Sequence, residues 1–223
     1  MFYAQSILTS KKRAIDIGAN VGIYSYFFAK EFECVEAFEP QLACASEILD
    51  WADSKSNVHV HCTALSDQNV LLPLHIPFDD QRLHSELATF NHSIGSKPRK
   101  HIYVPATKLD DYQFEEVSLI KIDVEGYEEK VLKGAEQTIL NSKPILLIEI
   151  EQRHIGKKSI LKIFNQIRDL GYSGYFFLDE KRVPLSEFSY ERHQKPFLIK
   201  PEFCDLAPNY QQGYVNNFIF EPI

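Results

Sequence analysis

Asp16-Ile17-Gly18-Ala19-Asn20-Val21-Gly22 is the stretch on which the predicted fold depends. It follows a short apolar run and precedes a segment, 23–30, whose pattern is typical of a helix. An acidic residue at a strand end, a glycine-bounded turn and a helix form the arrangement with which α/β proteins hold the polar part of a nucleotide-like cofactor. A second acidic residue, Glu39, ends the next apolar run, close to the roughly 20-residue spacing expected of a ribose-binding carboxylate. The two features together indicate an α/β fold and a nucleotide-like cofactor.

The glycine spacing narrows the class of cofactor. A dinucleotide-binding loop reads G-x-G-x-x-G, and its middle glycine lets the backbone approach a pyrophosphate. Here Ala19-Asn20-Val21 stands between Gly18 and Gly22, so the middle glycine is missing, and the sequence has no G-K-[ST] of a phosphate-binding loop. A cofactor with a ribose and a zwitterionic tail, such as S-adenosylmethionine, fits this turn better. The alternative is an ordinary βα turn that binds nothing.

Composition places the chain among globular proteins of one domain. Its 223 residues are 44% hydrophobic and 25% charged, which suits a single domain over 1–223. The net charge of −7 argues against a protein that grips nucleic acid through its phosphates. No apolar stretch approaches the roughly 20 residues of a membrane span, and no signal-peptide pattern opens the chain, so we expect a cytoplasmic protein. Cys34 and Cys62 fall in predicted strands, where we expect reduced core residues.

Apolar runs and helical periods alternate along the chain, which predicts a doubly wound parallel sheet with helices on both faces. Strands are expected at 14–16, 34–38, 58–62, 117–124, 145–150, 175–178 and 217–220, and helices at 23–30, 41–53, 127–139 and 158–170. The second of these helices would bury one apolar face, formed by Leu42, Ala45, Ile48, Leu49 and Ala52. We also expect a strand-rich insertion at about 68–106 and a lid-like loop at about 179–213, because so long a connection usually serves as a lid or binding segment.

Acidic residues end or follow most of the predicted strands. Ligands of open α/β sheets bind at the carboxyl ends of the strands, where carboxylates would repel phosphates but attract a sulfonium and an amino group. Asp123 and Glu125 would project to the same face if the strand 117–124 continues that far. They could accept the proton of a hydroxyl or hold a divalent cation, and the sequence leaves both roles open. No metal ligand is assigned, since the histidines of the insertion are too widely spread for a metal cluster: His75, His84, His92 and His101.

Six segments stand in the order and spacing of one methyltransferase family: 16–22, Phe38-Glu39-Pro40, 64–67, Leu109-Asp110, 120–128 and Ile148-Glu149-Ile150. Over roughly 14–151 the chain resembles the FkbM-family methyltransferases, and the closing 216–220 is similar to that family's last strand. The resemblance implies S-adenosylmethionine as cofactor, with S-adenosylhomocysteine as product. It implies a Rossmann-like class I methyltransferase fold, in which a seven-stranded, mostly parallel sheet has an antiparallel last strand and helices on both faces.

The same resemblance assigns roles to residues. The first loop would line the methionine end of the cofactor, Glu39 would accept both ribose hydroxyls, and the turn 64–67 would flank adenine. Asp123 and Glu125 would face the donor methyl. One of them, or His154, would take the hydroxyl proton, although an exposed loop histidine is an equal reading of His154. The cofactor-binding residues implied in this way are Asp16, Gly18, Asn20, Gly22, Glu39, Ala64, Leu65, Ser66 and Asp123.

We therefore expect an S-adenosylmethionine-dependent O-methyltransferase. The oxygen of a sugar, glycolipid or natural-product hydroxyl would attack the sulfonium methyl in line, and the enzyme would act mainly by positioning. Aromatic and basic residues of the lid-like loop, such as Tyr190 and Arg192, would suit a polar or anionic glycan. A small-molecule or glycan acceptor is thus expected, and nucleic acid is not. The alternatives are a non-catalytic S-adenosylmethionine-binding module and a nicotinamide-dependent oxidoreductase, and a divalent cation is left open.

Overall fold

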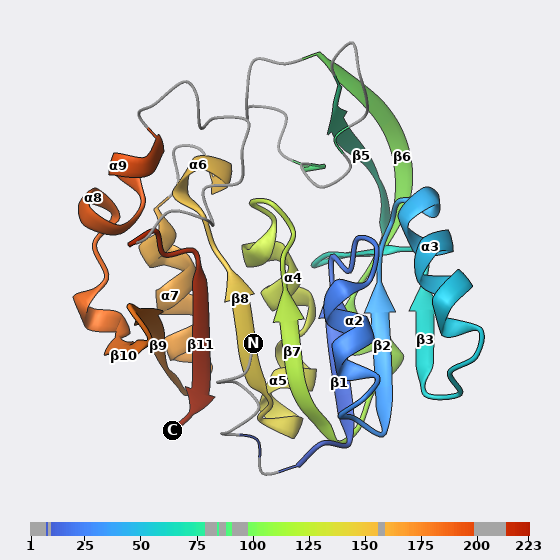
Figure 1. The fold of residues 1–223 in the computed structure, drawn as a ribbon, viewed down its shortest axis with the longest axis horizontal. Helices are drawn as coiled ribbons and strands as arrows, with labels where there is room; N and C mark the ends of the chain where they lie inside the picture. Colours follow the sequence, from blue (N-terminus) through green and yellow to red (C-terminus); the bar gives the residue numbers. More distant parts are fainter. Residues whose placement is uncertain are drawn as a thin grey trace.

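A mostly parallel sheet runs through the centre of the molecule (Figure 1). The computed structural model describes residues 8, 10–78, 84, 88–90, 98–155, 159–198 and 213–223. These residues form an eight-stranded sheet in the order β10-β9-β11-β8-β7-β1-β2-β3. The strands are β1 Arg13–Ile17, β2 Cys34–Phe38, β3 Val58–His61, β7 Val117–Ile122, β8 Ile145–Glu149, β9 Tyr172–Leu178, β10 Lys181–Pro184 and β11 Asn217–Pro222.

The strand directions agree with the predicted class I methyltransferase fold. β3, β2, β1, β7 and β8 pair in parallel, whereas β11 is antiparallel to both of its neighbours, β8 and β9. The additional strand β10 extends the sheet by a hairpin with β9, within the segment that the sequence assigns to a lid-like loop. The predicted fold class is confirmed, with this edge strand added.

Helices cover both faces of the sheet, which is why its central strands are nearly continuous apolar runs. α2 (Ile23–Phe28) packs on one face, where Phe28 contacts the core formed by Ala14, Val35 and Leu119. α3 (Leu42–Ala52) lies on the same side, because Ile48 packs against Ala37 of β2. The opposite face is covered by α4 Glu128–Gly134, α5 Glu136–Ser142 and α7 Ile160–Asp169 (Figure 1).

Four details differ from the sequence-based expectations. The apolar face of α3 is narrower than predicted, since Leu42 and Leu49 lie on its flank and are 69% and 52% exposed. The single helix expected at 127–139 is two helices, because the backbone leaves helical geometry at Ala135, with φ −115° and ψ 7°. Cys62 is exposed rather than in the core, because β3 ends one residue earlier. Cys34 is a free cysteine, as expected, but it is half-buried.

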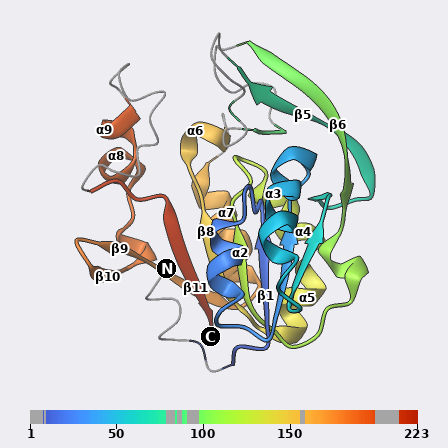
Figure 2. The same cartoon turned by 45° about the vertical axis from the view of Figure 1, so that its right-hand side comes forward.

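A second, three-stranded sheet rises above the carboxyl ends of the parallel strands (Figure 2). Its strands are β4 Ala64–Leu65, β5 Val70–Pro77 and β6 Arg99–Thr107, and β5 and β6 form a long antiparallel hairpin. Leu74, Ile76 and Val104 form its buried side together with Ala64. β5 and β6 form the two described ends of the predicted insertion and lie over the end of the main sheet where ligands of α/β proteins bind (Figure 2).

The described part of the predicted lid-like loop is tied to the same end of the main sheet. It contains η3 Leu185–Glu187, α8 Tyr190–His193 and α9 Lys195–Leu198, and 199–212 lie outside the described residues. Gln194 is fully buried and donates hydrogen bonds to the carbonyls of Ile150 (2.8 Å) and Val215 (2.9 Å). This side chain therefore fastens the α8–α9 segment to the ends of β8 and β11. None of the helices in the described part of the chain is long and apolar enough to cross a membrane.

Candidate active site

The turn after β1 is held against the end of β2. The amides of Gly18 and Ala19 both donate to the carbonyl of Phe38, at 3.0 Å each. Gly18 has φ 74°, and a Cβ there would lie 1.8 Å from the carbonyl oxygen of Asp123, so glycine is required. Gly22 begins α2 at φ 83°, where a Cβ would lie 2.9 Å from Ile48. The predicted glycine-bounded turn thus brings the ends of β1, β2 and β7 into contact.

Glu39 lies directly after β2 and is only 3% exposed. One carboxylate oxygen accepts from the amide of Asn20 (2.9 Å) and the other from the amide of Gln41 (2.8 Å). Burial raises the pKa of Glu39 in spite of these hydrogen bonds, which favour its charged form. Each oxygen can accept more than one hydrogen bond. The carboxylate is therefore fixed in place with acceptor capacity left for a ligand.

A cavity opens between the turn after β1 (residues 18–22, the first turn), Glu39 and the β5–β6 hairpin. The ends of β1, β2 and β7 supply its polar groups, and β4, the hairpin and Phe90 supply apolar ones. Its lining residues are Ile17, Gly18, Asn20, Phe38, Glu39, Pro40, Gln41, Ala64, Leu65, Leu74, Ala88, Phe90, Asp123, Val124 and Glu125. A concave site with apolar walls and a few convergent polar groups is the usual form of a small-molecule site.

A buried lysine stands beside this cavity. The side chain of Lys121 is 6% exposed, and its Nζ lies 3.3 Å from Oδ1 of Asp16 and 3.4 Å from Oδ2 of Asp123. Nζ also donates to the carbonyl of Gly18 at 3.2 Å and lies 4.8 Å from the centre of the Tyr24 ring. Burial alone would lower the pKa of Lys121, but the carboxylates of Asp16 and Asp123 outweigh it and hold the pKa above its usual value. The lysine is a fixed cation that joins β1, β7 and the first turn.

The loop after β7 reverses direction sharply. β7 ends at Ile122, and Glu125 and Gly126 have φ 49° and 93°. Asp123 and Glu125 therefore do not share a face by strand alternation, as the sequence suggested. They reach the same cavity because this left-handed turn folds the chain back. A Cβ on Gly126 would lie 2.1 Å from the carbonyl oxygen of His154, so α6 (Gln152–Ile155) packs directly on the turn.

His154 is buried between two carboxylates. Its Nδ1 lies 2.9 Å from Oε2 of Glu125, and its Nε2 lies 3.6 Å from Oε2 of Glu151. Burial alone would lower the pKa of His154, but the carboxylates of Glu125 and Glu151 outweigh it and raise the pKa to about 10. His154 is thus an imidazolium at neutral pH. The reading of this residue as an exposed loop histidine is wrong, since it is 7% exposed.

Two more carboxylates lie at the end of β8: Glu149 is its last residue, and Glu151 follows it. Asn216 donates to Oε1 of Glu149 at 2.7 Å and to Oε1 of Glu151 at 3.2 Å. Burial opposes the charge of Glu151, but His154 and Arg153 outweigh it and lower its pKa to about 2. Burial, reinforced by the nearby negative charges of Asp123 and Glu125, holds the pKa of Glu149 well above its usual value. The strand ends therefore carry carboxyl groups whose pKa values are shifted in opposite directions.

The structure separates the predicted site residues into two groups. Those that line the cavity are Gly18, Asn20, Glu39, Ala64, Leu65, Asp123 and Glu125. The remainder support it from outside. Asp16 is fully buried and accepts from Ser25 Oγ at 2.6 Å, and the amide of Ser66 bonds the carbonyl of Thr107 at 2.8 Å. Gly22 shapes the start of α2, and His154 contacts Glu125.

The sequence analysis missed the role of Lys121 and the side of the cavity that the β5–β6 hairpin forms. For Lys121 a signal was available: it is a lysine inside an otherwise apolar strand, and a buried lysine must find an opposite charge. Leu74 and Phe90 had no comparable signal. Their place at the cavity depends on pairing between β5, β6 and Thr89, which joins residues far apart in the sequence.

Comparisons with known proteins agree with this geometry. The family model described as Methyltransferase FkbM domain matches residues 16–173. Methyltransferase sdnD of Sordaria araneosa is 27% identical in an alignment 163 residues long, which covers 58% of this chain and 62% of that protein. The chain thus spans less than two thirds of this curated relative.

Solved structures share the fold at low sequence identity. The FkbM methyltransferase of Methylobacillus flagellatus has a TM-score of 0.59 at 18% identity, over 99% of this chain and 46% of that one. An rRNA methylase of Streptococcus thermophilus has a TM-score of 0.53 at 12% identity, over 100% and 93% of the two chains. A Streptococcus mutans protein solved with SAH has a TM-score of 0.52 at 10% identity, over 100% and 94%. Since the family model matches well over half of the sequence, this chain belongs to the FkbM methyltransferase domain family, whose cofactor is S-adenosylmethionine.

Proposed function

We propose that this protein transfers a methyl group from S-adenosylmethionine to a hydroxyl of a sugar, glycolipid or natural product. The observation that carries the proposal is one cavity lined both by Glu39, at the ribose-type position after β2, and by the acidic pair Asp123 and Glu125. One end of this cavity suits the donor, and the other offers groups that can take a proton. A cofactor and an acceptor could therefore meet inside it.

The residues present fit S-adenosylmethionine. At Gly18 no side chain could be accommodated, so main chain faces the cavity and can approach the methionine end closely. Glu39 offers a fixed carboxylate to the ribose hydroxyls, and Ala64 and Leu65 offer apolar contacts to adenine. The bound cofactor would supply a methyl group already activated on a sulfonium, which carboxylates nearby would attract.

The protein's own part is to orient the acceptor and receive its proton. Burial raises the pKa of Asp123, and the neighbouring charge of Glu125 adds to the rise, so Asp123 is a stronger base than an exposed aspartate. Glu125 is held by the His154 imidazolium at 2.9 Å. Because His154 is already protonated at neutral pH, we assign it a positioning role and assign proton acceptance to Asp123 or Glu125.

The net charge of −7 supports a small-molecule or glycan acceptor over nucleic acid. The described part of the lid-like segment supplies exposed basic groups near the carboxyl end of β8 and the start of β11, including Arg192 and Lys195. These groups would suit an acceptor with anionic substituents.

Calorimetry with S-adenosylmethionine tests the donor site. We expect Glu39→Gln to weaken binding by about tenfold or more, since hydrogen bonds to a charged group are worth about 1.5–3 kcal/mol. Glu47→Gln, at an exposed position of α3, is the matched control. Equal affinity of wild type and Glu39→Gln would contradict the ribose assignment.

Transfer of labelled methyl from S-adenosylmethionine to sugars, glycolipids and hydroxylated natural products tests the reaction. We expect an ether product with the wild type and a strongly reduced rate with Asp123→Asn at saturating donor concentration. Binding of the donor without transfer to any of these acceptors would favour a non-catalytic binding module.

A further inference from the structure

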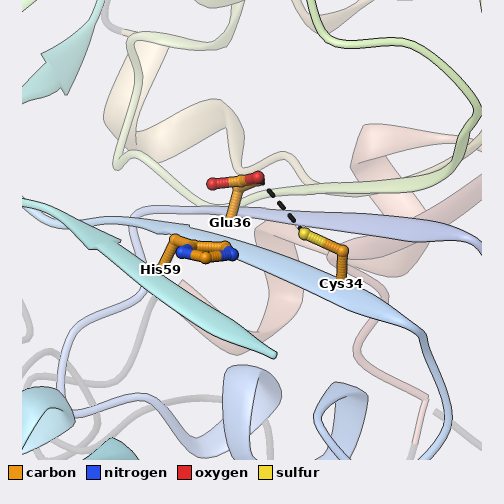
Figure 3. A group of neighbouring side chains, drawn as sticks. All are labelled: Cys34, Glu36 and His59. Atoms are coloured by element: carbon orange, nitrogen blue, oxygen red, sulfur yellow. Dashed lines mark hydrogen bonds between the residues drawn. The ribbon is translucent and has the colours of Figure 1, made fainter. Parts of the chain in front are cut away.

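Three side chains with metal-binding atoms gather at the opposite end of β2 from Glu39 (Figure 3). Cys34 and Glu36 are two residues apart on β2 and so project to the same face. His59 of β3 stands opposite Glu36 in the parallel register. One ligand atom from each, a sulfur, a carboxylate oxygen and an imidazole nitrogen, can be chosen so that all lie within 4.8 Å of one another. Two adjacent strands thus present a compact N, O, S set.

Glu36 is held in place before any ligand arrives. It is 3% exposed, and its Oε2 lies 2.7 Å from Nε2 of His61. The His61 ring is itself stacked on Phe38, with ring centres 4.4 Å apart. The thiol of Cys34 donates to Oε1 of Glu36 at 3.3 Å. A carboxylate whose second oxygen is bound by a packed histidine is the kind of supported ligand that metal sites use.

The cluster already attracts a positive charge. The guanidinium of Arg13 lies 3.3 Å from the Cys34 sulfur and forms an ion pair with Oε1 of Glu36. Its Nε donates to the carbonyl of Glu115 at 3.3 Å, and it lies 4.8 Å from the centre of the Phe114 ring. Arg13 is partly exposed, so its end group can leave this position for solvent. A cation that binds the cluster must therefore replace the guanidinium.

We propose that Cys34, Glu36 and His59 bind a zinc ion, which takes the place of the Arg13 guanidinium and completes a tetrahedral shell with water. Zinc is the biological cation that combines cysteine, histidine and carboxylate ligands in such sites. Burial, with the negative charge of Glu36, raises the pKa of the Cys34 thiol to about 11, so zinc binding would release its proton. The sequence contains no compact ligand motif here, because the three residues come from two strands. The site is separate from the proposed methyl-transfer cavity and does not depend on its function.

Cobalt(II) titration of the full chain tests the site, with zinc added afterwards as competitor. We expect a near-ultraviolet thiolate-to-cobalt charge-transfer band that zinc abolishes. Cys34→Ser should remove the band, and His59→Ala should weaken cobalt binding at least tenfold. Cys62→Ser is the control, because it removes an exposed thiol directly after β3. It should leave the charge-transfer band and the cobalt affinity unchanged.

Arg13→Gln separates a metal site from a purely structural ion network. We expect it to tighten cobalt binding severalfold, because the competing guanidinium is gone. No charge-transfer band in the wild type, a band that persists in Cys34→Ser, or unchanged affinity in Arg13→Gln would overturn the proposal. If Cys34→Ser fails to fold in a thermal melt, His59→Ala still decides, since His59 is exposed and its removal leaves no cavity.

Discussion

The α-carbon of Gly18 packs against the main-chain carbonyl of Asp123, so closely that a Cβ would lie 1.8 Å from the oxygen. This contact joins the turn after β1, which lines the proposed cofactor cavity, to the loop that carries the acidic pair Asp123 and Glu125. The Lys121 ammonium spans the same junction by donating to the carbonyl of Gly18 at 3.2 Å. The proposed cofactor-binding turn and the proposed proton-accepting pair are thus held together by one close contact.

Gly18→Ala should damage both stability and donor binding. The backbone must shift to relieve the clash, and the left-handed conformation, φ 74°, adds its own cost. We expect a loss of about 2–4 kcal/mol in the free energy of unfolding, from overpacking and strain together. Urea unfolding measures the first effect, and calorimetry with S-adenosylmethionine measures the second.

Gly171→Ala is the matched control for this substitution. Gly171 has φ 86°, but the nearest atom to a Cβ there would be Nζ of Lys143 at 3.5 Å, an ordinary contact. The free energy of unfolding of Gly171→Ala should therefore fall only by the cost of placing alanine in a left-handed conformation, about 1–2 kcal/mol. Its affinity for S-adenosylmethionine should not change. Equal effects of the two substitutions would show that the contact with Asp123 carries no special weight.

Lys121→Met should be strongly destabilising. It would leave the buried carboxylate of Asp16 and the partly exposed carboxylate of Asp123 without their cation, and breaking a buried ion pair costs about 3–5 kcal/mol. Lys133→Met, at a side chain 66% exposed, should change the free energy of unfolding by less than about 0.5 kcal/mol. Chemical denaturation measures both.

A double substitution shows whether Lys121→Met destabilises the protein by removing the ion pair or by changing the packing. Asp16→Asn removes one of the charges that Lys121 neutralises, so the double variant with Lys121→Met should be less destabilised than the sum of the single variants. Strict additivity would contradict the assigned role of Lys121.

The central sheet could be predicted because the apolar pattern within each strand indicates which of its faces are buried. The run at 117–124 is apolar on both faces, as a strand covered on both sides requires. Glu39 could be predicted in the same local way, from a strand end and a spacing. What the sequence could not supply are contacts between segments far apart. The pairing of Lys121 with Asp16, the place of Phe90 and the burial of His154 all depend on such contacts. Glu125 reaches the cavity because it adopts a left-handed conformation that no local pattern indicates.

Glu128 should make stability fall as pH rises. The residue is 2% exposed, its Oε1 accepts from the amide of Gly126 at 2.9 Å, and Oε2 has no hydrogen-bond partner among the described residues. Burial raises its pKa from 4.5 to about 7. Between these values the folded state keeps a proton that the unfolded state has lost, so the free energy of unfolding falls by up to about 3 kcal/mol.

Glu128→Gln should flatten this part of the pH profile. The amide cannot ionise, so the variant should gain stability relative to wild type as pH rises from 4.5 to 7. Glu136→Gln, at an exposed position in α5, should leave the profile unchanged. Denaturation midpoints across this pH range give the comparison, and parallel profiles of wild type and Glu128→Gln would contradict the raised pKa.

His154 should add a second, more alkaline fall in stability. Its pKa is raised from 6.5 to about 10, so the stabilisation by Glu125 and Glu151 is complete below pH 6.5 and is lost as pH rises through 10. The fall could reach about 4–5 kcal/mol. His154→Asn should be less stable than wild type at pH 6.5, and its free energy of unfolding should change little between pH 6.5 and 10. His193→Asn is the control, since burial lowers the pKa of His193, and a histidine whose pKa is lowered adds no loss of stability as pH rises. If His154→Asn kept the wild-type fall between pH 6.5 and 10, His154 would be neutral in the folded protein, and a proton-accepting role would again be open to it.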